Sequence, residues 1–191
     1  AAQQLIAAYR NVGASWADLD PLKRTERPNS PELEPAFYGF GDADQETVFD
    51  VSNTFFGKAK MSLRELLNAL RETYCGSIGA EYMYLSDHTQ KRWWQQKLES
   101  VRSKPSFNTD QKKHILDRLT AAEGLERFLH TKYVGQKRFS LEGGESFIAA
   151  MDELIQQAGT RGVQQIVIGM AHRGRLNVLV NTLGKMPADL F

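Results

Sequence analysis

The sequence predicts an α/β fold in which a helical N-terminal subdomain leads into the first part of a doubly wound α/β domain. Apolar residues recur at helical spacing between residues 61 and 130, which indicates several amphipathic helices. Val163 and the run Ile166 to Ile168 form a short, β-branched stretch, as expected for a strand buried on both faces of a parallel sheet. Helical patterns precede this stretch at residues 146–159 and follow it at 176–183, and this order begins a doubly wound layer.

The composition excludes several classes of partner. The 24 basic and 23 acidic residues give a net charge of +1, so the overall charge favours neither nucleic acid nor an anionic membrane surface. No apolar run approaches the roughly 18 residues of a membrane helix. Cys75 is the only cysteine, which excludes an intramolecular disulfide and favours a reducing compartment. We therefore expect a soluble, intracellular protein, and the missing initial methionine and the apolar ending Leu190-Phe191 suggest a fragment.

Residues 1–60 are predicted to form an extended arm with one short helix. Leu5, Ile6 and Tyr9 share one face of that helix. Four prolines alternate with charged residues between residues 13 and 44. Because proline fixes the backbone and removes a hydrogen-bond donor, this stretch cannot form a long helix.

Residues 61–130 are predicted to form the helical subdomain. Ser62 and Glu65 have the spacing of a capping box, and Met61 and Leu66 have the spacing of a hydrophobic staple, so a helix should begin directly after Ser62. Two further helices are predicted at 87–101 and 109–129. The first helix should bury Leu63, Leu66, Leu67, Leu70 and Tyr74. The second should bury Trp94, Leu98 and Val101, and the third Ile115, Leu116, Leu119 and Ala122.

Residues 131–191 are predicted to start the α/β domain, which the end of the chain truncates. Its first helix, 146–159, should end at Gly159. The buried face predicted for this helix consists of Phe147, Ile148, Met151, Leu154 and Ile155.

His172 is the main candidate for chemistry because it stands just past the predicted strand, at the edge where open α/β sheets bind ligands. An imidazole can transfer a proton near neutral pH, and the neighbouring Arg173 and Arg175 favour an acidic substrate. Two other interpretations stay open. His172 can simply cap its own loop, and the arginines can pair with acids such as Asp152 or Glu153.

Other candidate sites carry weaker signals. Gly143-Gly144 precedes a helix and can form an anion-binding nest there, although no Walker A or Gly-x-Gly-x-x-Gly pattern is present. His88, His114 and His130 lie in different predicted elements without metal-ligand spacing, so we assign them no role.

Four blocks of sequence, at residues 73–83, 119–126, 137–144 and 169–179, together resemble the thiamine-dependent E1 subunits of 2-oxoglutarate dehydrogenase complexes. The resemblance implies an N-terminal fragment of an enzyme that oxidatively decarboxylates 2-oxoglutarate on thiamine diphosphate with Mg2+. It also implies succinyl transfer to the lipoyl group of the E2 dihydrolipoyl succinyltransferase, a homodimer with a second E1 subunit, and a cytoplasmic location in bacteria or a mitochondrial-matrix location in eukaryotes. The family's main cofactor motif would lie beyond residue 191, so the fragment alone should be inactive.

The resemblance also assigns roles to two residues. It implies that His172, in Gly-Met-Ala-His-Arg-Gly-Arg, is a catalytic residue that lines the substrate site, and that Phe139, in Lys-Arg-Phe-Ser, lies beside both cofactor and substrate. Near the start, Tyr9 to Ser15 departs from the family's usual Arg-Gly-His stretch. Two alternatives remain: an E1 for a related acid such as 2-oxoadipate, and a segment that serves only dimer or complex assembly.

Overall fold

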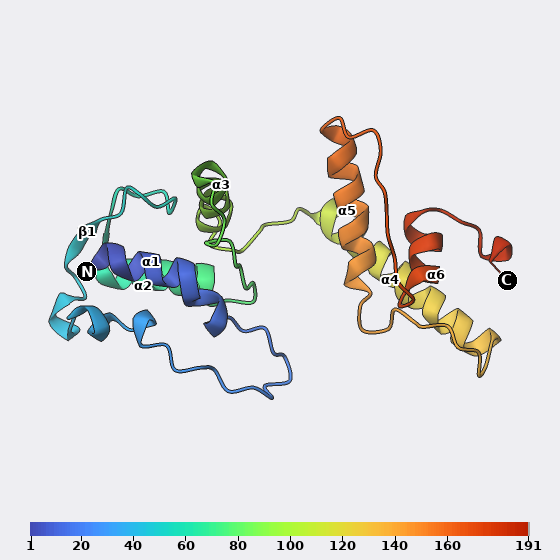
Figure 1. The fold of residues 1–191 in the computed structure, drawn as a ribbon, viewed down its shortest axis with the longest axis horizontal. Helices are drawn as coiled ribbons and strands as arrows, with labels where there is room; N and C mark the ends of the chain where they lie inside the picture. Colours follow the sequence, from blue (N-terminus) through green and yellow to red (C-terminus); the bar gives the residue numbers. More distant parts are fainter. Residues whose placement is uncertain (191) are drawn as a thin grey trace. The chain divides into compact units, whose positions relative to one another are not determined.

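The computed structural model describes residues 1–190 of the chain. They form two compact units, Ala1–Ser106 and residues 107–190 (Figure 1). Within the described residues, no helix is long and apolar enough to cross a membrane.

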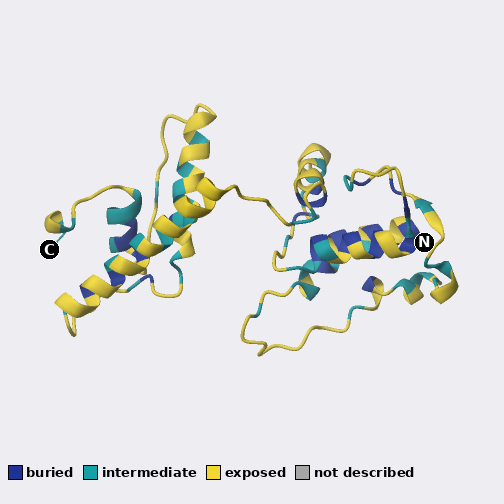
Figure 2. Ribbon diagram, turned by 180° about the vertical axis from the view of Figure 1, so that it is seen from behind, coloured by how far each residue is buried: buried dark blue, intermediate teal, exposed yellow. Residues whose placement is uncertain are grey.

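The core of the first unit is built on two helices, α1 (Ala2–Val12) and α2 (Leu63–Tyr74), which lie side by side. Leu5 and Ile6 of α1 pack in one cluster with Leu66 and Leu70 of α2, and all four are almost completely buried. Figure 2 shows buried stretches, in dark blue, along these paired helices. The buried faces predicted for both helices are therefore confirmed. The N-terminal helix belongs to this core, whereas residues 17–30 follow an irregular, largely exposed path.

Helix α2 begins where the sequence predicts. The hydroxyl of Ser62 accepts the amide hydrogen of Glu65 at 3.2 Å, and the Glu65 carboxylate accepts the amide hydrogen of Ser62 at 3.1 Å. Met61 and Leu66 are both buried, as a hydrophobic staple requires. Strands β1 (Val48–Asp50) and β2 (Lys60–Ser62) form an antiparallel hairpin that delivers the chain to this cap.

Helix α3 (His88–Glu99) shows a different buried face from the one predicted. Asp87 caps it, and Leu98 is buried, but Trp94 is 41% exposed because Gln95 and Glu99 face the core instead. The carboxylate of Glu99 is fully buried.

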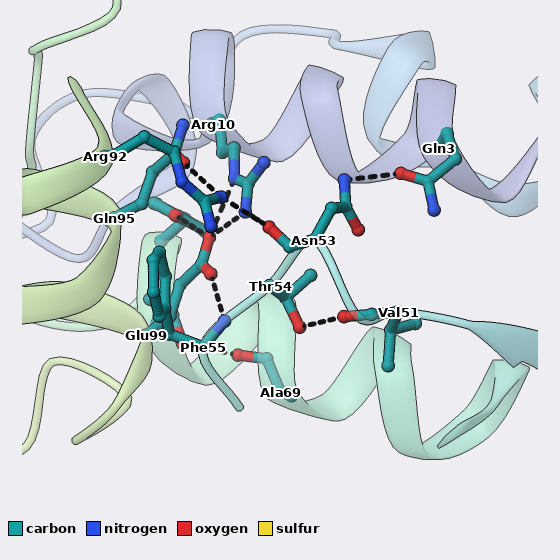
Figure 3. A network of polar contacts seen from close by, with 12 residues as sticks. Gln3, Arg10, Val51, Asn53, Thr54, Phe55, Ala69, Arg92, Gln95 and Glu99 are labelled. Atoms are coloured by element: carbon teal, nitrogen blue, oxygen red, sulfur yellow. Dashed lines mark hydrogen bonds and ion pairs between the residues drawn. The ribbon is translucent and has the colours of Figure 1, made fainter. Parts of the chain in front are cut away.

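A network of hydrogen bonds surrounds the Glu99 carboxylate (Figure 3). The carboxylate accepts hydrogen bonds from Nε of Arg10 at 2.7 Å, from the hydroxyl of Tyr74 at 2.7 Å, and from the backbone amide of Phe55 at 2.9 Å. Because each donor comes from a different part of the chain, this one side chain joins α1, α2, α3 and the loop after β1.

The second unit is helical. Helix α4 (Thr109–Lys132) packs against α5 (Ser146–Thr160) and against the segment formed by α6 (Arg175–Asn177) and the π-helical turn Val178–Thr182. Asn108 caps α4 in a second capping box. The buried cluster of this unit consists of Ala122, Leu141, Ile148 and Val178.

The prediction of a strand at Val163 and Ile166 to Ile168 is wrong, because the structure has no strand there. Residues 163–173 are irregular, and Val167 is 96% exposed. A strand needs backbone hydrogen bonds to a neighbouring strand, and the only sheet among the described residues is the hairpin of the first unit. The doubly wound layer is therefore not formed in the described part of the chain.

The buried faces predicted in the second unit are only partly correct. Ala122 and Ile148 are buried, but Leu116 and Leu154 are 63% and 56% exposed.

Candidate functional site

The structure brings together the two residues to which the sequence assigned a role. The rings of Phe139 and His172 stack, with centroids 5.1 Å apart and planes inclined by 29°. Both residues are exposed, so one face of each ring covers the other while the remaining surface faces solvent. His172 thus lies at the surface beside an aromatic ring, although the segment before it is irregular rather than a strand.

A backbone hydrogen bond joins the two segments beside the stacked rings. The amide of Gly174 donates to the carbonyl oxygen of Phe139 at 2.8 Å. Gly174 has φ +73°, and a Cβ atom there would lie 2.6 Å from Cδ1 of Leu141. A side chain at position 174 would therefore have to displace the Leu141 side chain and would also be strained in the left-handed conformation, which glycine adopts readily. Phe139 itself has φ +47°, which is uncommon for a residue with a bulky side chain.

A cavity of about 200 Å³ lies beside Phe139. Leu129 and Leu176 supply apolar parts of its wall, and Lys137 and Arg175 supply cationic ones. Such a lining suits a small ligand with an apolar stem and an anionic group.

Two other sequence candidates, Arg173 and Asp152, have partners within the chain. Nη2 of Arg173 donates to the carbonyl oxygen of Glu142 at 3.3 Å. Asp152, an alternative partner for the arginines, instead accepts from His114 at 2.6 Å.

The predicted anion nest at Gly143-Gly144 is filled by a side chain of the protein. The amide of Gly143 donates to the carboxylate of Glu145 at 2.9 Å. Hydrogen bonds from the backbone amides of Glu145 itself and of Gly143 hold the pKa of this carboxyl below its ordinary value. The structure therefore gives no support to an external anion at this turn.

Sequence reasoning missed Glu126 of α4, which is buried and binds residues of the two segments that carry the aromatic pair. Its carboxylate accepts hydrogen bonds from the amide of Leu141 at 3.0 Å, from Nδ2 of Asn177 at 3.1 Å, and from Nη1 of Arg138 at 3.2 Å. The missed signal was its position between Ala122 and Leu129 on one helical face. A charged residue on an apolar stripe indicates a buried polar partner.

The described residues contain no group of three or more His, Cys, Asp or Glu side chains that could hold a metal ion. Cys75 is half-buried in the first unit, and this burial raises the pKa of its thiol. A raised pKa disfavours the nucleophilic thiolate, so we assign Cys75 no catalytic role.

Comparison with known proteins identifies the relatives of this chain. It is 80% identical over all 191 residues to the 2-oxoglutarate dehydrogenase E1 component of Cupriavidus necator. The chain belongs to the 2-oxoglutarate dehydrogenase E1 family. The E1 components of Azotobacter vinelandii and Haemophilus influenzae are 51% and 47% identical over 98% of the chain.

The chain spans about a fifth of the length of these E1 components, since the match covers 20% of each. No protein-family model matches it. The 80% identity to a named E1 component confirms the family that the four sequence blocks indicate.

Proposed function

We propose that this chain is the N-terminal part of an E1 component that oxidatively decarboxylates 2-oxoglutarate on thiamine diphosphate and transfers the succinyl group to the lipoyl group of E2. The observation that carries the proposal is the stacking of Phe139 on His172 at the surface of a chain whose relatives are named for this activity. In the same proposal, residues 131–191 begin the domain that binds thiamine diphosphate.

His172 is the proposed catalytic and substrate-binding residue. Its imidazole can donate a hydrogen bond to a carboxylate of the dicarboxylic substrate or transfer a proton during the reaction. The stack with Phe139 would restrict the orientation of the imidazole. Orientation of this kind is a large part of how enzymes lower reaction barriers.

Phe139 is the proposed contact to both cofactor and substrate. Its ring is 53% exposed despite the stack, so apolar surface remains for a ligand to cover. Covering this surface would exclude water from the imidazole and strengthen the hydrogen bonds it makes.

The cofactor in this proposal is thiamine diphosphate with Mg2+, and it supplies the electron sink for decarboxylation. The family resemblance implies that the main binding motif for this cofactor lies beyond residue 191, so we propose no Mg2+ ligand among the described residues. Phe139 is the one residue that we place beside the cofactor.

The proposed partners are a second E1 subunit, forming a homodimer, and the E2 dihydrolipoyl succinyltransferase. The named relatives are components of a multienzyme system from bacteria, which supports a cytoplasmic location for the complex.

The test is His172→Ala in the full-length E1, assayed with 2-oxoglutarate and an artificial electron acceptor so that E2 is not needed. We expect kcat/KM to fall by about 10²-fold or more, the usual contribution of a positioned proton-transfer group. His88→Ala is the matched control, because His88 is an exposed histidine of the first unit. An unchanged kcat/KM for His172→Ala would instead favour a segment that serves only assembly.

The same assay decides the substrate. We expect wild-type kcat/KM to be higher for 2-oxoglutarate than for 2-oxoadipate, because one extra methylene in a fitted pocket changes kcat/KM by about 10-fold to 200-fold. A preference for 2-oxoadipate would assign the chain to an E1 for that acid.

A further inference from the structure

The backbone that carries the aromatic pair has no regular secondary structure of its own. Phe139 lies in the irregular stretch between α4 and α5, and His172 lies in the irregular stretch before α6. Neither helix nor sheet hydrogen bonds therefore fix the two rings, and other contacts must hold the segments in register.

Glu126 supplies contacts on both sides of the pair. Its carboxylate binds Arg138, directly before Phe139, and the amide of Leu141, two residues after it. The same carboxylate binds Asn177 of α6, the helix that follows His172. The Glu126 side chain thus forms hydrogen bonds to the segment that carries Phe139 and to the helix directly after His172.

The surroundings of Glu126 support a single, fixed arrangement. The Glu126 side chain is 4% exposed and that of Arg138 is 13% exposed, so water competes little for their ion pair. Nη1 of Arg138 also donates to the Glu126 carbonyl oxygen at 3.0 Å, and Nδ2 of Asn177 also donates to the Ala122 carbonyl oxygen at 2.9 Å. A buried and satisfied network of this kind favours one local conformation.

We propose that Glu126 is the positioning residue of the Phe139–His172 pair. It is too deeply buried to be a contact of the substrate, and it acts by setting where the two rings lie. Its catalytic consequence rests on the function proposed above, whereas its effect on ring geometry does not.

The experiment uses Glu126→Gln, which keeps the size of the side chain but replaces one acceptor oxygen with a donor amide. That amide must face either Arg138 or the pair of donors from Leu141 and Asn177, so at least one hydrogen bond is lost. Glu123→Gln is the matched control. Glu123 lies one turn earlier on α4 and pairs with Arg127 at the surface.

The readout is the NMR shift of the His172 ring protons in the 191-residue chain. Protons stacked over an aromatic ring resonate upfield, so His172 should show an upfield shift that disappears in Phe139→Leu. His172→Gln assigns the resonances among the 4 histidines. The ring protons of His88 and His114, which lie away from the pair in sequence and contacts, serve as internal controls for folding.

We expect Glu126→Gln to lose most of the upfield shift at His172 while the resonances of His88 and His114 stay in place. Glu123→Gln should keep the wild-type shift. An upfield shift in Glu126→Gln equal to that of the wild type would overturn the proposal, and so would the lack of any upfield shift in the wild type.

If circular dichroism shows that Glu126→Gln loses helix, the test uses Asn177→Asp instead. This variant removes the donor amide to Glu126 and Ala122 but keeps the acceptor oxygen that Asn181 binds. The upfield shift at His172 should then decrease, and an unchanged shift would equally overturn the proposal.

Full-length E1 carrying Glu126→Gln separates this proposal from the proposed function. We expect kcat/KM for 2-oxoglutarate to fall by up to about 10²-fold, because small displacements of catalytic groups have effects of that size. A lost NMR shift with unchanged kcat/KM leaves Glu126 as the positioning residue but rejects the catalytic role of the pair. A lower kcat/KM with an unchanged shift rejects positioning.

Discussion

At the scale of single residues, the site depends on two unusual backbone conformations. Phe139 and Gly174 both have positive φ, and the amide of Gly174 donates to the carbonyl oxygen of Phe139. Leu141 fills the space where a side chain at position 174 would lie. Two features therefore favour glycine at position 174: its left-handed backbone conformation and the nearby side chain of Leu141.

We predict that Gly174→Ala destabilises the second unit more than Gly162→Ala does. Gly162 also has positive φ, at +86°, but a Cβ atom there would contact nothing within 4 Å. Gly162→Ala should therefore cost about 1–2 kcal/mol from the left-handed conformation alone. Gly174→Ala should cost more because Leu141 must also move.

Urea unfolding followed by circular dichroism measures both variants. Tryptophan fluorescence is unsuitable because Trp16, Trp93 and Trp94 all belong to the first unit. Equal losses of unfolding free energy in the two variants would show that the approach of Leu141 to residue 174 is not tight.

At the scale of elements, the start of α2 is fixed by a capping box. Glu65 has two roles there, since it accepts the amide hydrogen of Ser62 and pairs with Lys58 at 2.7 Å. The hydrogen bond from Lys58, followed by that from the Ser62 amide, lowers the pKa of the Glu65 carboxyl from its ordinary value of 4.5. Both contacts need the ionised carboxylate.

The lowered pKa predicts how α2 responds to acid. Because the folded-state pKa of Glu65 is below the unfolded value, its contribution is present above pH 4.5 and is lost as pH falls through the folded-state pKa. Glu65→Gln should therefore lower the urea midpoint of the first unit at neutral pH, and this deficit should shrink in acid.

Tryptophan fluorescence during urea unfolding, at about pH 7 and again below the lowered pKa, tests this response. Glu81→Gln, which changes an exposed carboxylate of the same unit, is the control. A deficit for Glu65→Gln that stays the same at both pH values would mean that protonation of Glu65 does not control the cap.

At the scale of the whole chain, features whose partners lie close together in sequence were predictable, and features that depend on partners far away in sequence were not. The capping box at Ser62 lies within four consecutive residues, so its sequence contains all the partners it needs. The strand expected at residues 163–168 depends on a neighbouring strand, and the described part of the chain supplies none there. The apolar run predicted burial, but Val163, Ile166 and Val167 are exposed because no neighbouring strand covers them in the described part of the chain.

The same distinction applies to the site. His172 and Phe139 were identified from sequence, His172 by its position and family resemblance and Phe139 by resemblance alone. Their stacking depends on contact between two irregular segments that lie far apart in sequence. Glu126 was missed because the donors that make its burial favourable, Arg138, Leu141 and Asn177, come from segments distant in sequence. Helical periodicity records which face is buried, but it does not record which polar groups meet there.

The most direct test of the account is a double-mutant cycle in full-length E1, with Phe139→Leu, His172→Ala and the double variant assayed for kcat/KM with 2-oxoglutarate. If the stacked rings act on the substrate as one unit, the two losses are not additive, and the coupling free energy should be about 0.5–3 kcal/mol, as for residues in contact. Losses that add to within about 0.5 kcal/mol would show that the two residues act independently, and this would contradict the account.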